Sequence, residues 1–179
     1  MKSLNLYINN VANIQNPRIT NSNFPINEAT SLVIYANERD PLYINNTFVY
    51  QGTGAGNQDY VVYIGKKGLY KFNDKFNLFN SGNSVSLISY QQNTMSDKRL
   101  QIDVGNITNG TLNLNLTGAI KFHLIHDTNG ALIINNISIT SGGLPGTSVI
   151  DIGNDIDIIN DNITIGSSST TGYIIERLI

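Results

Sequence analysis

Few side chains in this sequence could do chemistry, and the two histidines are the first to consider. His123 and His126 are three residues apart on a predicted strand. On a β-strand this spacing points the two rings to opposite faces, so they cannot bind one metal ion together without a bulge. His123 shares its face with Lys121, and the sequence contains no G-x-S-x-G nucleophile motif. We therefore expect solvated or interfacial histidines and no enzyme activity.

The densest acidic stretch lies near the C-terminus, in the sequence Asp-Ile-Gly-Asn-Asp-Ile-Asp-Ile-Ile-Asn-Asp-Asn. Hard cations such as Ca²⁺ take about six to eight oxygen ligands, and Asp and Asn at alternate positions can supply several. The EF-hand order with its bidentate Glu is missing, and Asp155 and Asp157 flank Ile156 as the polar face of a strand would. A solvated strand face is therefore the main interpretation, a structural cation site is the alternative, and no cofactor is expected. The candidate cation ligands are Asp151, Asp155, Asp157 and Asp161.

Six tyrosines fall within residues 35–70, with Asn and Gln nearby. A tyrosine combines a rigid apolar ring with a hydroxyl, which is why it is favoured at protein interfaces. Aromatic faces beside amides also suit sugar rings, and Tyr43 and Tyr60 are candidate stacking platforms. Three roles stay open, namely core and cross-strand packing, a protein interface and a glycan site. The residues are Tyr35, Tyr43, Tyr50, Tyr60, Tyr63 and Tyr70.

The elements that position these side chains are strands, because apolar and polar residues alternate almost everywhere. Clear examples are residues 4–9, 112–117 and 120–125. Asn-Gly at residues 109–110 and at 129–130 predicts turns between strands. The sequence therefore predicts an all-β fold, an antiparallel β-sandwich or jelly roll. Further strands are expected at Ser31–Ala36, Asn46–Gln51, Asp59–Gly65, Gly68–Phe72, Ser84–Gln91, Arg99–Val104, Ala131–Ile139, Ser148–Ile152, Asp155–Ile159 and Thr171–Arg177.

Two similar segments leave a second architecture open. Thr-Asn-Gly-Thr-Leu at residues 108–112 resembles Thr-Asn-Gly-Ala-Leu at residues 128–132. Their separation is close to one coil of a β-solenoid. The spacing does not continue on either side, and two hairpins with the same Asn-Gly turn explain it equally well. A β-solenoid is therefore the alternative to the sandwich.

The composition changes along the chain. Thirteen of the fifteen Tyr and Phe residues precede residue 91, whereas 18 of the 26 isoleucines follow it. This shift divides the chain into an aromatic-rich β unit at 31–96 and an Ile-rich β unit at 97–179, which could equally form one continuous domain. Residues 1–30 are expected to hold an N-terminal strand followed by an extended polar arm. The arm is predicted because Pro17 and Pro25 have no backbone N–H to donate to a sheet ladder. In an oligomer the arm could lie across a neighbour.

The overall composition restricts the partners. Charged residues make up 13% of the chain, about half the ~25% of an ordinary soluble domain. The 27 asparagines supply neutral amides, which can be buried at an interface without the cost of desolvating charge. The few, scattered Lys and Arg give no electrostatic footprint for nucleic acid or an anionic membrane. The N-terminus alternates too strictly for a signal peptide, so we expect synthesis in a cytoplasm.

Asn- and Ile-rich alternating strands, Asn-Gly turns, a polar N-terminal arm, no cysteine and no signal peptide occur together here. In these features the chain resembles virion structural proteins of tailed bacteriophages, namely capsid decoration, head-fibre, tail and baseplate proteins. The resemblance covers the whole chain but includes no specific motif, so no functional residue is carried over. It implies a non-enzymatic β-sandwich or jelly roll that assembles with itself, as a trimer or other symmetric ring, and with other proteins of a virion or extracellular assembly. The alternative is a carbohydrate-binding or adhesion module.

Overall fold

The protein is described here by a computed structural model, in which the all-β prediction is confirmed. The structure describes residues 4–11, 19–20, 31–39, 41–52, 58–65, 70–73, 77–79, 85–92, 97–140, 146–154 and 157–179. Among these residues there is no helix that is long and apolar enough to cross a membrane. The strands are β1 (Leu4–Val11), β2 (Ile19–Thr20), β3 (Ser31–Asn37), β4 (Leu42–Ile44), β5 (Thr47–Tyr50), β6 (Asp59–Ile64), β7 (Lys71–Phe72), β8 (Asn77–Phe79), β9 (Val85–Gln92), β10 (Arg99–Asn115), β11 (Ala119–Asp127), β12 (Leu132–Ile134), β13 (Ile137–Thr140), β14 (Thr147–Gly153) and β15 (Asn162–Leu178).

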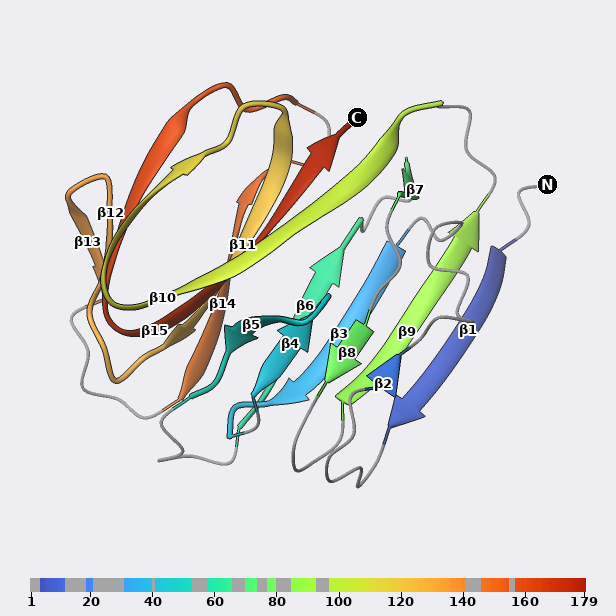
Figure 1. Ribbon diagram of the computed structural model, residues 1–179, viewed down its shortest axis with the longest axis horizontal. Coiled ribbons are helices and arrows are strands. Elements are labelled where there is room, and N and C mark those ends of the chain that lie inside the picture. The colour runs from blue at the N-terminus through green and yellow to red at the C-terminus, as the bar shows by residue number, and fades with distance from the viewer. Residues whose placement is uncertain are drawn as a thin grey trace.

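The described strands form three sheets (Figure 1). Two of them have four strands each, in the orders β1-β9-β3-β6 and β2-β8-β4-β5. The third has seven strands: five follow the order β13-β12-β15-β10-β7, β11 also pairs with β15, and β14 pairs with β11. Every pair in the three sheets is antiparallel except β10 with β7, so the large sheet is mixed.

The large sheet curls into a half-barrel because one of its two long strands, β15, changes partner along its length. β10 and β15 have 17 residues each and pair along almost their whole length. The other edge of β15 pairs with β12 through its first half and with β11 through its second half. The sheet therefore bends along β10 and β15, and a jelly-roll-like curl results.

The two Asn-Gly sequences have different roles, which corrects the prediction of a turn at both. Asn129 and Gly130 lie in the turn that follows β11. Asn109 and Gly110 instead lie inside β10, where the pairing register with β15 shifts between Thr108 and Gly110. Asn109 has a φ of 49°, and a left-handed residue that interrupts a ladder makes a β-bulge. The similar segments are therefore not equivalent coils of a solenoid.

The predicted strand Ala131–Ile139 is a hairpin instead. Its two strands, β12 and β13, are joined by Asn135 and Asn136, whose φ angles are 48° and 66°. Two consecutive left-handed residues make the tight turn whose twist matches a hairpin. Asn45 and Asn46 join β4 to β5 with the same geometry. Consecutive asparagines thus mark the tight hairpins of this fold.

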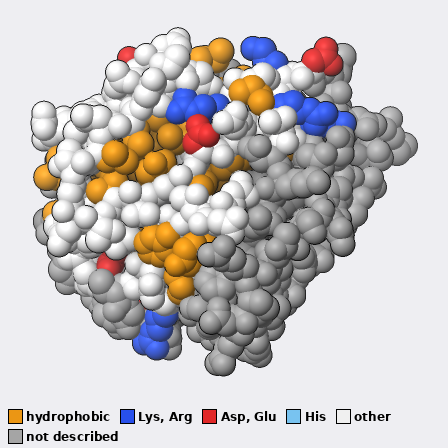
Figure 2. Space-filling model, viewed as in Figure 1, with side chains coloured by type: hydrophobic (Ala, Val, Ile, Leu, Met, Phe, Trp, Pro, Cys, Tyr) orange, Lys and Arg blue, Asp and Glu red, His pale blue; other side chains and the backbone are white. Residues whose placement is uncertain are grey.

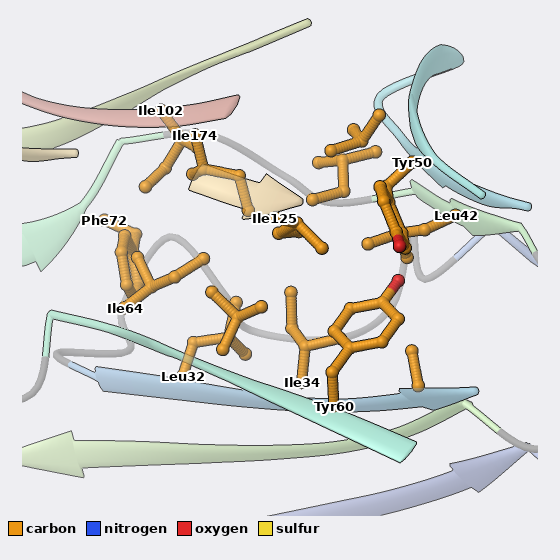
Figure 3. Packing of buried hydrophobic residues seen from close by; sticks show 14 of the residues in the cluster. Leu32, Ile34, Leu42, Tyr50, Tyr60, Ile64, Phe72, Ile102, Ile125 and Ile174 are labelled. Atoms are coloured by element: carbon orange, nitrogen blue, oxygen red, sulfur yellow. The ribbon is translucent and has the colours of Figure 1, made fainter. Parts of the chain in front are cut away.

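Two hydrophobic cores lie against the large sheet. The first collects residues from both halves of the sequence, so that Leu32 and Ile34 of β3 lie in the same cluster as Ile125 and Ile174 (Figure 3). The second lies within the curl and includes Phe122 and Leu124 on the opposite face of β11. Because both faces of β11 are covered, all nine of its residues are buried.

Candidate functional site

His123 is buried, which corrects the expectation of a solvated or interfacial side chain. Its ring lies between two carboxylates, with Nδ1 2.6 Å from Oδ1 of Asp151 and Nε2 2.7 Å from Oε1 of Glu176. Burial by itself lowers the pKa of His123, but the hydrogen bonds and charges of Asp151 and Glu176 outweigh it and raise that pKa above 6.5. The two carboxylates therefore favour the protonated form of the ring. The strand face that carries it is covered by the first core, not by water.

Glu176 connects this histidine to another sheet. The side chain is fully buried, and both of its carboxylate oxygens accept a hydrogen bond from the backbone N–H of Gly65, at 3.1 and 3.2 Å. Gly65 follows β6, so the contact joins the large sheet to the sheet that contains β3 and β6. Lys121 Nζ lies 3.8 Å from Asp151 at the exposed end of the network. The arrangement can fix two sheets together, and His123 and Glu176 are both 0% exposed.

A second polar network lies where β3, β5 and β14 meet. Glu38 is 2% exposed, and one of its carboxylate oxygens, Oε2, accepts a hydrogen bond from the hydroxyl of Thr147 at 3.0 Å. The hydroxyl of Tyr50 lies 2.8 Å from the same Thr147 oxygen. Burial raises the pKa of Tyr50, so this phenol stays protonated and donates to Thr147. The other oxygen of Glu38, Oε1, is buried and has no hydrogen-bond partner among the described residues.

His126 is also fully buried, on the opposite face of β11 from His123. Its Nε2 lies 2.9 Å from the carbonyl oxygen of Gly130, which can only accept, so Nε2 carries the proton. Nδ1 is then an acceptor and lies 2.8 Å from the hydroxyl oxygen of Thr171. Burial lowers the pKa of His126 and favours its neutral form. The Thr171 hydroxyl is also 2.9 Å from Ser167 Oγ, which continues the chain outward.

That chain ends at an open pocket of about 350 Å³ beside the β10 bulge. Asn109 and Thr111 of β10 line one side, Ile133 of β12 lines another, and Gly166 and Ser168 of β15 lie between them. None of the residues that line the pocket is charged or aromatic. The pocket can therefore offer neutral hydrogen-bonding groups and one aliphatic surface to a ligand.

The structure does not gather the described acidic residues of this stretch, Asp151, Asp157 and Asp161, around one point. Asp151 pairs with His123, whereas the backbone N–H and the carboxylate of Asp157 both bind the side chain of Asn154. The backbone carbonyl of Asp161 accepts a hydrogen bond from Leu116, and Asp155 lies outside the described residues. Within the described ranges no group of three or more acidic or histidine side chains is placed to hold a metal ion.

Two of the six tyrosines belong to the first core. The rings of Tyr50 and Tyr60 meet edge to face with centroids 5.4 Å apart, and Figure 3 shows their hydroxyls pointing toward one another. Tyr60 is only 4% exposed. It cannot be a stacking platform for a sugar, because its β6 position faces the core rather than solvent.

The other four tyrosines are partly or more fully accessible. Tyr43 is half-buried against the ring of Phe48, with centroids 5.4 Å apart, and Tyr70 packs at the edge of the first core. Tyr35 and Tyr63 are exposed on the outward face of β3 and β6. Any surface role in this set therefore falls mainly to Tyr35 and Tyr63.

Sequence reasoning missed the acidic partners Glu38 and Glu176. Glu176 carried a signal, because it shares a strand face with the core residue Ile174 within the predicted strand Thr171–Arg177. A lone acid in an apolar row indicates a buried carboxylate that needs partners. Glu38 follows the end of its strand, and its burial has no comparable signal.

No protein-family model matches the sequence, and no curated protein matches it. Several solved structures resemble the fold distantly, and three of them are described here. The conserved protein of unknown function PA5104 from Pseudomonas aeruginosa PAO1 has a TM-score of 0.35 and 9% identity, covering 98% of this chain and 81% of that chain. The major capsid protein P2 from bacteriophage PM2 has a TM-score of 0.31 and 10% identity over 99% and 97% of the two chains. HutD from Pseudomonas fluorescens SBW25 has a TM-score of 0.33 and 6% identity, covering 98% of this chain and 79% of that chain. Likeness at this level assigns no family and carries no function to the chain.

Proposed function

We propose that the chain is a non-enzymatic structural protein of a large assembly, built from homo-oligomers that also bind other assembly proteins. The observation that carries the proposal is the outer strand β13. Ile137 and Ile139 of this strand are 65% and 46% exposed. Among the described strands, β13 pairs with β12 alone, so its other edge presents unpaired backbone groups.

An uncharged edge of this kind favours pairing with another strand. Natural edge strands are commonly protected by charged side chains or proline, because free N–H and C=O groups accept a further strand. The hairpin Leu132–Thr140 contains neither a charged residue nor a proline. The face of the molecule seen in Figure 2 fits the same role, since most of its described side chains are uncharged. The occupant we propose is the edge of a second copy of this chain in a closed ring such as a trimer.

The finer assignment is to a viral (phage) particle, as a capsid decoration, head-fibre, tail or baseplate protein. It rests on the resemblance in composition and patterning, together with the edge strand. The absence of enzyme activity belongs to the same proposal, because the rings of His123 and His126 are fully buried and committed to internal hydrogen bonds. Synthesis in a cytoplasm and residence in a virion or other extracellular assembly follow from it, with no nucleic acid or membrane as partner.

Light scattering over a hundredfold concentration range tests the proposal on the full chain. We expect a mass that is a fixed multiple of 19.6 kDa. The double variant Ile137→Lys, Ile139→Lys should be monomeric with an unchanged circular dichroism spectrum. Ile158→Lys is the control, since Ile158 lies outside the hairpin and is 49% exposed, close to the 46% of Ile139. A monomeric wild-type protein, or a double variant that still assembles, would overturn the proposal.

A further inference from the structure

The pocket beside the β10 bulge has hydrogen-bonding groups that the fold itself does not use. The side chains of Asn109 and Thr111 make no hydrogen bond within the described part of the chain. Ser168 Oγ accepts a hydrogen bond from the backbone N–H of Ala131 at 2.7 Å, which leaves its own O–H to donate. One amide and two hydroxyls therefore face the same open space.

Glycines on the two long strands keep this space open. A Cβ atom on Gly166 would lie 3.7 Å from both Ile133 Cβ and Thr111 Oγ1, which is ordinary van der Waals contact. A Cβ on Gly110 would meet its nearest neighbour, Thr108 O, at 3.7 Å. Neither glycine is required by close packing or by a left-handed backbone, so a side chain could be present at either. Because Gly110 and Gly166 have no side chains, the floor of the pocket stays open.

Internal hydrogen bonds also hold the floor of the pocket in place. Ser167 lines the pocket but is 7% exposed; its hydroxyl oxygen accepts a hydrogen bond from the backbone N–H of Ser169 and lies 2.9 Å from that of Thr171. Thr171 is in turn held by the buried ring of His126. This chain ties the pocket to the second core, where side chains have little freedom. Preorganised groups lose less entropy when a ligand binds.

The lining defines the chemistry of the ligand. It contains no charged residue, so a charged ligand would lose hydration without gaining a partner. Ile133 supplies an aliphatic side wall, while the amide and hydroxyls suit a molecule that carries several hydroxyls. A volume of about 350 Å³ lies at the small end of the range for ligand sites. We propose that this pocket binds a neutral sugar residue, a function separate from the proposed assembly and independent of it.

The test is a titration of the isotope-labelled full chain with neutral monosaccharides, followed by backbone amide NMR. The probes are glucose, galactose, mannose, N-acetylglucosamine and N-acetylgalactosamine. We expect at least one sugar to shift the amides of Gly110, Gly166 and Ser168 saturably, with a Kd on the order of millimolar, because the open site makes few hydrogen bonds. No saturable shift with any of the five sugars would overturn the proposal.

Substitutions locate the site. Gly166→Val should fill the pocket and weaken binding at least about tenfold, while its β-branched side chain suits a strand. Thr164→Val is the control, because Thr164 lies on the same face two residues away and outside the pocket. Thr111→Val removes one hydroxyl without changing shape and should weaken binding several-fold, which keeps the test valid if Gly166→Val does not fold. Unchanged binding in both pocket variants, shifts centred on Tyr35 and Tyr63, or tighter binding of an acidic sugar such as glucuronate would contradict the proposal.

Discussion

Nε2 of His123 lies 2.7 Å from Oε1 of Glu176, and the same carboxylate accepts hydrogen bonds from the backbone of Gly65. A buried histidine of the half-barrel is thereby connected to the end of β6 in a different sheet. Two charges are buried in this contact, and their desolvation is offset by the second carboxylate, Asp151, on the other side of the ring. The network fixes the relative position of two sheets that otherwise meet through apolar side chains.

The two carboxylates should differ in their effect on stability. Glu176→Gln should lower the free energy of unfolding by about 3–5 kcal/mol, because it breaks a fully buried ion pair. Asp151→Asn should cost about 1 kcal/mol or less, since the Asp151 side chain is 40% exposed and water screens it. Urea denaturation at neutral pH measures both values. Equal losses in the two variants would show that burial does not set the strength of this network.

The histidines should give opposite slopes of stability against pH. The pKa of His123 is above 6.5 in the folded chain, so its stabilising effect is complete below pH 6.5 and is lost as pH rises through the folded-state pKa. The pKa of His126 is below 6.5, so its neutral ring stabilises the fold above pH 6.5 and this effect falls as pH drops through the folded-state pKa. Unfolding midpoints of wild type, His123→Gln and His126→Gln between about pH 5 and pH 9 separate the two effects. Slopes of the same sign would contradict this assignment.

Glu38 and Thr147 should respond in opposite directions to substitution. Thr147→Val removes the only hydrogen bond to the Glu38 carboxylate among the described residues and leaves a buried charge unsolvated. We expect a loss of about 2–3 kcal/mol or more. Glu38→Gln removes the charge and keeps an acceptor for Thr147, so it should be nearly neutral or stabilising. The comparison uses the same denaturation assay, and a large loss in Glu38→Gln would mean that the charge itself is needed.

The alternation of apolar and polar residues predicts most of the strands, although the described residues 157–159 of the predicted strand Asp155–Ile159 form none, and it does not predict what covers each face. In residues 120–125 apolar and polar residues alternate, as they do in a strand with one solvent-exposed face. Both faces of β11 are nevertheless buried. His123 is buried because β14 and β15 flank it and β6 lies across it. These contacts join residues that are far apart in the sequence, so a local sequence pattern cannot predict them.

The difference between a turn and a bulge is likewise decided at long range. Asn109-Gly110 and Asn129-Gly130 have the same local preference for a left-handed backbone. The first remains within a strand because residues on both sides of it continue to pair with β15. The pocket beside the bulge follows from that pairing, so it too was beyond prediction from the sequence alone.

A last prediction concerns the glycines of the long strands, which look alike in the sequence. A Cβ on Gly172 would lie 2.5 Å from the carbonyl oxygen of Val49, because β5 crosses β15 there with backbone against backbone. Gly172→Ala should therefore destabilise the protein by about 3 kcal/mol, since neither main chain can move without disturbing its sheet. Gly110→Ala is the matched control, and it should change stability by less than about 1 kcal/mol, because its nearest neighbour is 3.7 Å away. Urea midpoints of the two variants give the comparison, and a Gly172→Ala protein as stable as wild type would show that β5 does not approach β15 this closely.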